Sequence, residues 1–246
     1  MRKAEYETMF HVEETHWWYA TLHELLFATL DKEMPAWRSK RILDAGCGTG
    51  AILQRLGNPE MHCGVDLSPD AIAFCHQRGL KNAQQADICA LPFADSSFDA
   101  VICSSVLYHE WVPKVDVALL ELRRVMQPGG LFLINLPAYG FLHSAHDEAV
   151  MTARRFTKSE VKSLLNKNGF AIARLTYWTT LAFPLAVVAR TLGMSRSGRD
   201  FESSGNTWTD RVMAAMARFE VTILKIFSLP FGVALFGVAR KPSGGF

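Results

Sequence analysis

Residues 42–50 read Ile-Leu-Asp-Ala-Gly-Cys-Gly-Thr-Gly, an apolar run that enters an aspartate and three alternating glycines. Glycine adopts positive φ at little cost, so such a turn brings the backbone close to a ligand and lets its amides face it. A dinucleotide site needs the spacing GxGxxG, whereas this loop has GxGxG. The stretch therefore predicts a strand, a ligand-binding turn and a helix, and it disfavours a nicotinamide dehydrogenase.

Apolar runs of strand length recur along the chain, separated by segments long enough for helices. The candidate strands are residues 41–45, 63–66, 83–87, 100–104, 130–135, 170–177 and 231–240. The candidate helices are residues 6–30 (one helix or two), 50–56, 69–78, 114–126, 157–168 and about 209–227. Thr157 and Glu160 have the spacing of a capping box. This alternation is typical of an α/β fold with a parallel sheet.

The composition fits a globular protein with a large packed core. Of the 246 residues, 49% are hydrophobic and 20% are charged. The 26 basic and 24 acidic residues nearly balance, which argues against nucleic acid as a substrate. The cysteines form no CxxC pair and Met1–Phe10 lacks the features of a secretory signal. We therefore expect free thiols and a cytoplasmic protein.

Residues 181–227 are unusually apolar. The uncharged stretches Leu175–Ala189 and Ile226–Ala239 are too short to span a bilayer, and each contains a proline. Four interpretations stay open for this region: core packing, the wall of an apolar pocket, a homodimer interface, and peripheral contact with the inner face of a membrane. The polar stretch 195–210 within it is typical of a mobile loop.

An acidic residue ends the second candidate strand. Asp66 lies roughly 20 residues beyond Gly46, where a carboxylate can accept hydrogen bonds from both hydroxyls of a ribose. Further along, Phe98–Ser105 and the turn Pro128-Gly129-Gly130 complete an ordered series of motifs.

With these motifs, the chain resembles small-molecule class I S-adenosylmethionine-dependent methyltransferases over roughly residues 40–137. The resemblance implies a Rossmann-like α/β fold, in which a seven-stranded, mostly parallel sheet carries helices on both faces. It also implies no metal ion. The expected division of a single domain (1–246) is an N-terminal helical cap (1–39), a cofactor-binding core (40–137) and a substrate-side half (138–246) with an apolar helical insertion at about 180–228, before the last strand.

The resemblance also assigns residues to S-adenosylmethionine. In the family, the first motif cradles the amino-acid end of this cofactor, the residue after the ribose-binding acid packs on the adenine, and an acid with an apolar neighbour contacts the ring after the third strand. The cofactor-binding residues expected on this basis are Tyr19, Asp44, Gly46, Cys47, Gly48, Asp66, Leu67, Asp87, Ile88 and Ser104.

Tyr19 belongs to residues 14–19, Glu-Thr-His-Trp-Trp-Tyr, which resemble a segment that folds over the cofactor in many bacterial relatives. An arginine often follows there, but residues 20–23 read Ala-Thr-Leu-His. We therefore expect Tyr19 or His16 to contact the cofactor instead. The alternative is that these aromatic residues only pack on the sheet.

Methyl transfer is an in-line displacement at a sulfonium methyl, so the protein must orient the nucleophile and exclude water. An acidic oxygen needs no base, whereas a hydroxyl, amine or carbon acceptor must be deprotonated, a task that suits histidine. His146 and His109 are the candidate catalytic residues. The alternatives are that His109 bonds to the cofactor or a loop and that His146-Asp147 caps a helix or holds a lid.

The expected activity is methyl transfer to an oxygen, nitrogen or carbon of a small acceptor, for which a hydrophobic or lipid-like molecule is one possibility. Because the usual arginine is missing after Tyr19, a cofactor-binding scaffold or sensor without transfer activity is the alternative.

Overall fold

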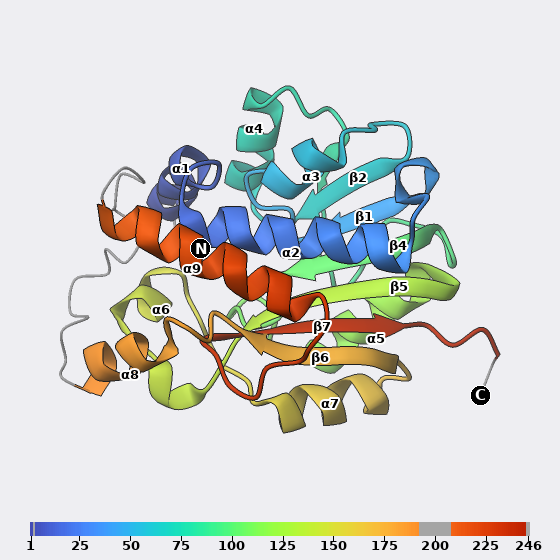
Figure 1. Ribbon diagram of the computed structural model, residues 1–246. Helices are drawn as coiled ribbons and strands as arrows, with labels where there is room; N and C mark the ends of the chain where they lie inside the picture. Colours follow the sequence, from blue (N-terminus) through green and yellow to red (C-terminus); the bar gives the residue numbers. More distant parts are fainter. Residues whose placement is uncertain (2, 192–207, 245–246) are drawn as a thin grey trace.

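One sheet runs through the molecule in the order β3-β2-β1-β4-β5-β7-β6 (Figure 1). The computed structural model describes residues 1, 3–191 and 208–244. The strands are β1 (Ile42–Ala45), β2 (His62–Asp66), β3 (Ala83–Gln85), β4 (Phe98–Ser104), β5 (Met126–Pro137), β6 (Ala171–Trp178) and β7 (Ala234–Arg240). Only β7 runs against its neighbours β5 and β6. The seven-stranded, mostly parallel sheet expected from the sequence is confirmed.

Helices cover both faces of the sheet. They are α1 (Lys3–Val12), α2 (Trp17–Glu33), η1 (Trp37–Ser39), α3 (Ala51–Leu56), α4 (Pro69–Gln77), α5 (Val115–Val125), η2 (Gly140–Leu142), α6 (Ala145–Ala149), α7 (Lys158–Lys167), α8 (Phe183–Thr191) and α9 (Trp208–Leu224). The expected helical cap precedes β1 as α1 and α2, and the expected insertion lies between β6 and β7 as α8 and α9 (Figure 1).

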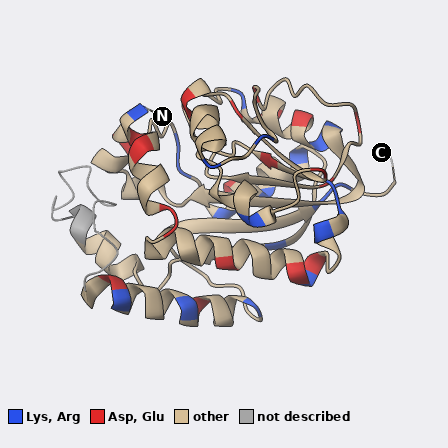
Figure 2. Cartoon of the chain, turned by 90° about the horizontal axis from the view of Figure 1, so that it is seen from above, with Lys and Arg blue, Asp and Glu red and all other residues tan. Residues whose placement is uncertain are grey.

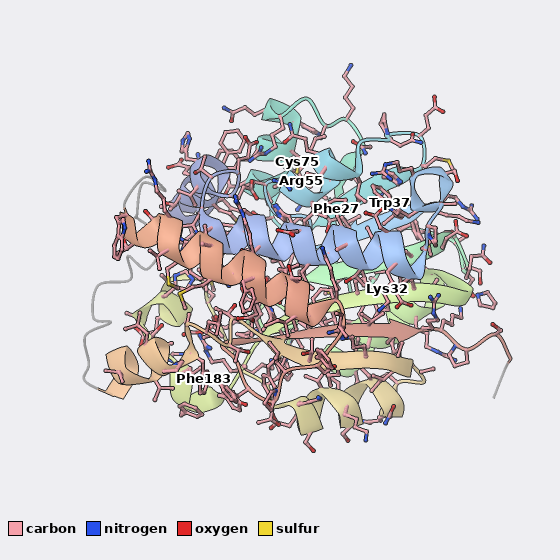
Figure 3. All side chains as sticks on the ribbon, viewed as in Figure 1. Phe27, Lys32, Trp37, Arg55, Cys75 and Phe183 are labelled. Carbon is pink, nitrogen blue, oxygen red and sulfur yellow. The ribbon has the colours of Figure 1, made fainter. Side chains whose placement is uncertain are left out.

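The sheet separates two hydrophobic clusters. On one face, α2, α3, α4 and α9 bury residues such as Leu26, Leu53 and Val221. On the other face, α5 and α7 bury Leu119 and Leu165 among others. Figure 3 shows Phe27 and Trp37 close together on the α2 side, where their ring centroids lie 5.6 Å apart. Burial of apolar area on both faces is the main stabilising contribution to such a fold.

Local sequence signals explain several element ends. The predicted capping box is present, with Thr157 Oγ1 accepting from the Glu160 amide at 3.3 Å. His16 caps the N-terminus of α2, because its Nδ1 accepts from the Trp18 amide at 3.2 Å. The third strand is shorter than predicted and ends at Gln85, because Asp87 instead makes a turn in which its side chain accepts from the Cys89 amide.

The region between β6 and β7 differs in part from its prediction. Most of the polar stretch 195–210, predicted to be a mobile loop, lies outside the described residues, but its last residues, from Trp208 on, are the first turn of α9. Among the described residues, no helix is both long and apolar enough to cross a bilayer.

The topology determines where a ligand binds. The chain places β2 and β3 on one side of β1 and returns to place β4 on the other side. In open α/β sheets, ligands bind beyond the carboxyl ends of the strands at such a reversal. The glycine turn after β1 and Ser104 at the end of β4 both lie there.

Candidate functional site

A cavity of about 580 Å³ lies beyond the carboxyl ends of β1, β2 and β4. Segments of α1, α2, α6, α8 and α9 complete its walls. The predicted site residues that line it are Tyr19, Gly46, Cys47, Gly48, Asp66, Leu67, Asp87, Ile88, Ser104, His109 and His146. The fold thus brings together residues that are far apart in the sequence.

The glycine turn has the expected backbone conformation, with φ of +84° at Gly46, +55° at Gly48 and +91° at Gly50. It is also closely packed, because a Cβ on Gly46 would lie 2.2 Å from Val106 Cγ2. The sequence predicted that the amides of this turn face a ligand, and two of them do not. Those of Gly46 and Cys47 both donate to the Val65 carbonyl rather than facing the cavity. The turn is therefore held against β2 by its own backbone, and it shapes the cavity through close approach.

Asp66 places a buried carboxylate in the cavity wall. Its Oδ2 accepts from the Gly48 amide at 3.0 Å and its Oδ1 from the Ser68 amide at 2.9 Å. Burial raises the pKa of this carboxyl, while the two amide bonds oppose the increase. A carboxylate oriented in this way can accept further hydrogen bonds from a pair of ligand hydroxyls.

Asp44 is the predicted site residue that does not line the cavity. Its side chain is buried beneath the turn, and neither carboxylate oxygen makes a hydrogen bond of ordinary geometry with the described residues. Burial, reinforced by the charges of Asp66 and Glu13, raises the pKa of Asp44 to about 8. The group is therefore mostly protonated at neutral pH and brings little charge to the site.

One wall of the cavity can accept an aromatic ring. Leu67 follows β2, and Ile88 follows the turn of Asp87, so both contribute apolar surface. Asp87 Oδ1 accepts from the Cys89 amide at 2.8 Å, which fixes the turn. Ser104 lies at the end of β4, which is on the other side of β1 from β2 and β3.

Helix α1 covers the glycine turn, a contact that sequence reasoning missed. Met9 Cε lies 2.8 Å from the position of a Cβ on Gly48, and the Tyr6 hydroxyl lies 3.5 Å from Asp66 Oδ1. Tyr6 and Met9 both line the cavity. No local motif marks them, because their partners lie on β2 and on the turn after β1.

Arg78 attaches this cover to the core. The guanidinium donates to the Thr49 carbonyl through Nε at 2.8 Å and to the Phe10 carbonyl through Nη2 at 3.2 Å. It also forms ion pairs with Glu13 and Glu14, and the Glu13 carboxylate accepts from the Thr49 hydroxyl. Because Arg78 and Glu13 are both buried, these contacts fix the turn between α1 and α2 over the cavity.

The aromatic segment, residues 14–19, includes the first residues of α2 and forms part of the cavity wall. His16 and Tyr19 both line the cavity. Burial raises the pKa of Tyr19 well above its ordinary value, so the hydroxyl stays protonated. The Tyr19 ring lies edge-on to Trp18 at 5.1 Å, and Trp18 packs against Trp178 of β6. The segment therefore both packs on the sheet and reaches the cavity.

The two candidate catalytic histidines lie in the same cavity. His109 stacks on Tyr108 at 4.5 Å, and burial lowers the pKa of His109 to about 4. The imidazole is therefore neutral at pH 7 but a weak base. His146 lies in α6, next to Asp147.

Asp147 has a structural role that the sequence offered as an alternative. It forms a capping box with Ser144 at the start of α6. It also pairs with Arg155, whose Nε lies 2.9 Å from Oδ1. Although burial alone would raise the pKa of Asp147, Arg155 and Ser144 hold it below its usual range. The pair fixes the loop beside His146.

The remaining wall is largely apolar. Trp111, Val112 and Val150 contribute to it, as do Leu185 of α8 and Met213 of α9. Among the described residues, no three His, Cys, Asp or Glu side chains form a group that could hold a metal ion. The cavity thus combines the polar groups at the glycine turn with apolar side chains, some of which come from α8 and α9.

Known methyltransferases match part of the chain. A family model described as a methyltransferase domain matches residues 43–134. A fatty-acid O-methyltransferase from Mycolicibacterium smegmatis is 45% identical over 103 residues, which are 38% of this chain and 36% of that protein. A malonyl-[acyl-carrier protein] O-methyltransferase from Erwinia pyrifoliae is 35% identical over 150 residues, 58% of this chain and 56% of that protein. The chain thus spans about a third to a little over half of these relatives' length.

The fold is similar over nearly the whole chain to solved structures. A crystal structure of an S-adenosylmethionine-dependent methyltransferase from Thermotoga maritima matches with a TM-score of 0.60 and 18% identity. The match covers 97% of this chain and 95% of that one. At this identity, the likeness concerns the fold alone.

Proposed function

Because the chain belongs to the class I S-adenosylmethionine-dependent methyltransferase family, we propose that it transfers the methyl group of S-adenosylmethionine to an oxygen of a small apolar acceptor. The observation that carries this proposal is one cavity in which the glycine turn and Asp66 meet an apolar wall. Cofactor and acceptor would lie end to end in it.

Residues of the cavity wall fit this cofactor. Asp66 offers carboxylate oxygens to the two ribose hydroxyls, and Leu67 and Ile88 offer apolar surface to the adenine. The volume of about 580 Å³ lies in the range of small-molecule sites. Tyr19 and His16 reach the cavity from the aromatic segment, where they would take the place of the missing arginine.

Bound S-adenosylmethionine would supply an electrophilic methyl on a positively charged sulfur. The protein's part is then to orient the acceptor and to exclude water. Helix α1 and the turn held by Arg78 cover the glycine turn, and the Asp147–Arg155 pair fixes the loop that borders the acceptor end. These contacts hold the cavity walls in place, and the two charges that border the acceptor end, those of Asp147 and Arg155, neutralise each other.

We favour a carboxylate as the accepting oxygen. A carboxylate is already deprotonated at pH 7, whereas a hydroxyl needs a base, and His109 with a pKa of about 4 is a weak one. Two relatives are named for O-methyl transfer to a fatty acid and to malonyl-[acyl-carrier protein]. His109 and His146 would then orient the acceptor rather than remove a proton.

The acceptor would reach the cavity past α8. Leu185 lines the cavity and is 65% exposed, so it joins the interior to the surface. Peripheral lipid contact within residues 181–227 would let an apolar acceptor enter without crossing water. A homodimer through the same region is the alternative.

The test compares three acceptors with the same alkyl chain. Purified protein is incubated with methyl-labelled S-adenosylmethionine and dodecanoic acid, dodecanol or dodecylamine. We expect the methyl ester of the acid to form and the alcohol and amine to remain unmodified. Methylation of the alcohol or amine alone would contradict the carboxylate assignment. Cofactor binding without transfer to any acceptor would favour the scaffold or sensor.

A further inference from the structure

The outward face of α9 combines basic and large apolar side chains. Its exposed residues recur at helical spacing and continue just past the end of the helix. The α9 stripe, as we name this surface, consists of Trp208, Arg211, Arg218, Phe219, Lys225 and Ile226. Trp208 is 78% exposed, Phe219 62% and Ile226 74%. One such residue needs no explanation, but several on one face of a helix mark an interaction surface.

The acidic residues of the helix do not belong to this surface. Asp210 and Glu220 are both buried. The Glu220 carboxylate accepts from the amides of Thr180 and Leu181, which ties the segment before α8 to α9. Figure 2 shows Lys and Arg recurring along α9, the outermost helix at the lower edge of that view. The charged side chains that α9 and Lys225 expose are therefore all basic.

The cations of the stripe are available to a partner. Within the described residues, the side chains of Arg211, Arg218 and Lys225 form no ion pair. Unpaired Lys and Arg close to an anionic membrane contribute about 1 kcal/mol each to binding. Aromatic and aliphatic side chains between them would enter the boundary between headgroups and acyl chains.

We propose that the α9 stripe docks the protein on an anionic lipid surface. This inference deepens the lipid contact proposed above by naming the face that binds and the charge of the lipid. A second copy of the chain fits the same face poorly, because a symmetric contact would bring the stripe's cations together. Met213, on the inner side of α9, lines the cavity, so docking would place the cavity beside the lipid.

The apolar neighbourhood of α8 supports this orientation. Figure 3 shows Phe183 at the start of α8. Its ring lies 5.4 Å from that of Phe231 and 5.6 Å from that of Tyr139. Phe231 and Leu185 are both exposed. These residues add exposed apolar surface around α8, which supplies Leu185 to the cavity wall.

The test measures sedimentation with vesicles in the absence of S-adenosylmethionine. Vesicles of phosphatidylcholine alone are compared with an equimolar mixture of phosphatidylcholine and phosphatidylglycerol. We expect binding to the mixed vesicles, release by high salt, and at least tenfold weaker binding for Arg211→Gln/Arg218→Gln, in line with about 1 kcal/mol for each charge. Phe219→Ser is expected to weaken binding as well.

Two variants on other helices serve as controls. Lys158→Gln/Lys162→Gln removes the same charge from α7, and Leu120→Ser removes a side chain on α5 that is 52% exposed. Both should bind like the unmodified protein, with circular dichroism confirming that every variant is folded. Equal binding to both vesicle types, no binding to either, or full binding by the arginine variant would overturn the proposal. The acceptor assay uses no vesicles, so it tests the proposed function independently of lipid docking.

Discussion

The Asp66 carboxylate is the residue on which cofactor binding should depend most. Asp66→Asn keeps the size of the side chain but replaces one carboxylate oxygen by an amide nitrogen, which cannot accept a hydrogen bond from a ribose hydroxyl. Because a hydrogen bond to a charged group contributes about 1.5–3 kcal/mol, we expect the Kd for S-adenosylmethionine to rise roughly 10- to 100-fold. Calorimetric titration measures this. Asp70→Asn, in the first turn of α4 and outside the cavity, is the control and should bind normally.

His23 makes stability depend on pH. The imidazole is 2% exposed, and burial lowers its pKa from 6.5 to about 3, with Arg55 and Arg78 adding to the decrease. Below pH 6.5 the unfolded chain binds a proton at His23 that the folded chain does not bind. The contribution of His23 to the free energy of unfolding is therefore complete above pH 6.5 and is lost as the pH falls toward 3. Between pH 7 and pH 5, the loss from this group is about 2 kcal/mol.

His23→Leu should remove this dependence. His23 Nδ1 has no hydrogen-bond partner among the described residues, so an apolar replacement leaves no new polar group unsatisfied. Urea unfolding at both pH values tests the prediction, with the free energy of unfolding of the variant falling less than that of the unmodified protein. An equal decrease in the free energy of unfolding for the two proteins would show that folding does not lower the pKa of His23.

Helix α1 should depend on Arg78 for its position. Removing one partner of a buried ion pair leaves the other charge uncompensated, at a cost of about 3–5 kcal/mol. We therefore expect Arg78→Met to destabilise the protein and to speed amide hydrogen exchange in residues 3–12, while β4 and β5 stay protected. The double variant Arg78→Met/Glu13→Met should regain much of the stability.

The matched control for this helix is Arg38→Met. The Arg38 side chain is 73% exposed, and its guanidinium lies 3.8 Å from Asp31. Exposed pairs of this kind contribute about 0–1 kcal/mol, so exchange in α1 should not change. Equal exchange in Arg78→Met and the unmodified protein would mean that α1 holds its place without Arg78, through contacts such as those of Tyr6, Met9 and Phe10.

The elements differ in how far the sequence reveals them. The strand before the glycine turn and the capping box at Thr157 follow from local patterns, because the spacing of apolar residues, the turn residues and the helix caps each involve only a few neighbouring positions. The spacing from Gly46 indicated Asp66, and the resemblance added the assignments of Leu67, Asp87 and Ile88. All four line the cavity. The position of α1 was not predictable in this way, because Arg78 joins it to the core across a separation that no local pattern encodes.

The sheet connects the site to both hydrophobic clusters. Strands β1, β2 and β4 carry the cavity residues at their carboxyl ends, and the side chains of the same strands alternate between the two faces. Leu43 belongs to one cluster and Ile42 to the other. A ligand bound beyond these strands should therefore stabilise both clusters together.

Thermal unfolding tests the proposal that residues 1–246 form a single domain. At a concentration of S-adenosylmethionine about 100 times its Kd, binding adds about 2.7 kcal/mol to the free energy of unfolding. For a chain of this size, that should raise the Tm by roughly 5–10 °C. Calorimetry should show one transition that moves as a whole, with no shift from NAD and a smaller one for Asp66→Asn. Two transitions, of which one ignores the ligand, would divide the chain into independent units, and no shift at all would contradict the proposed cofactor.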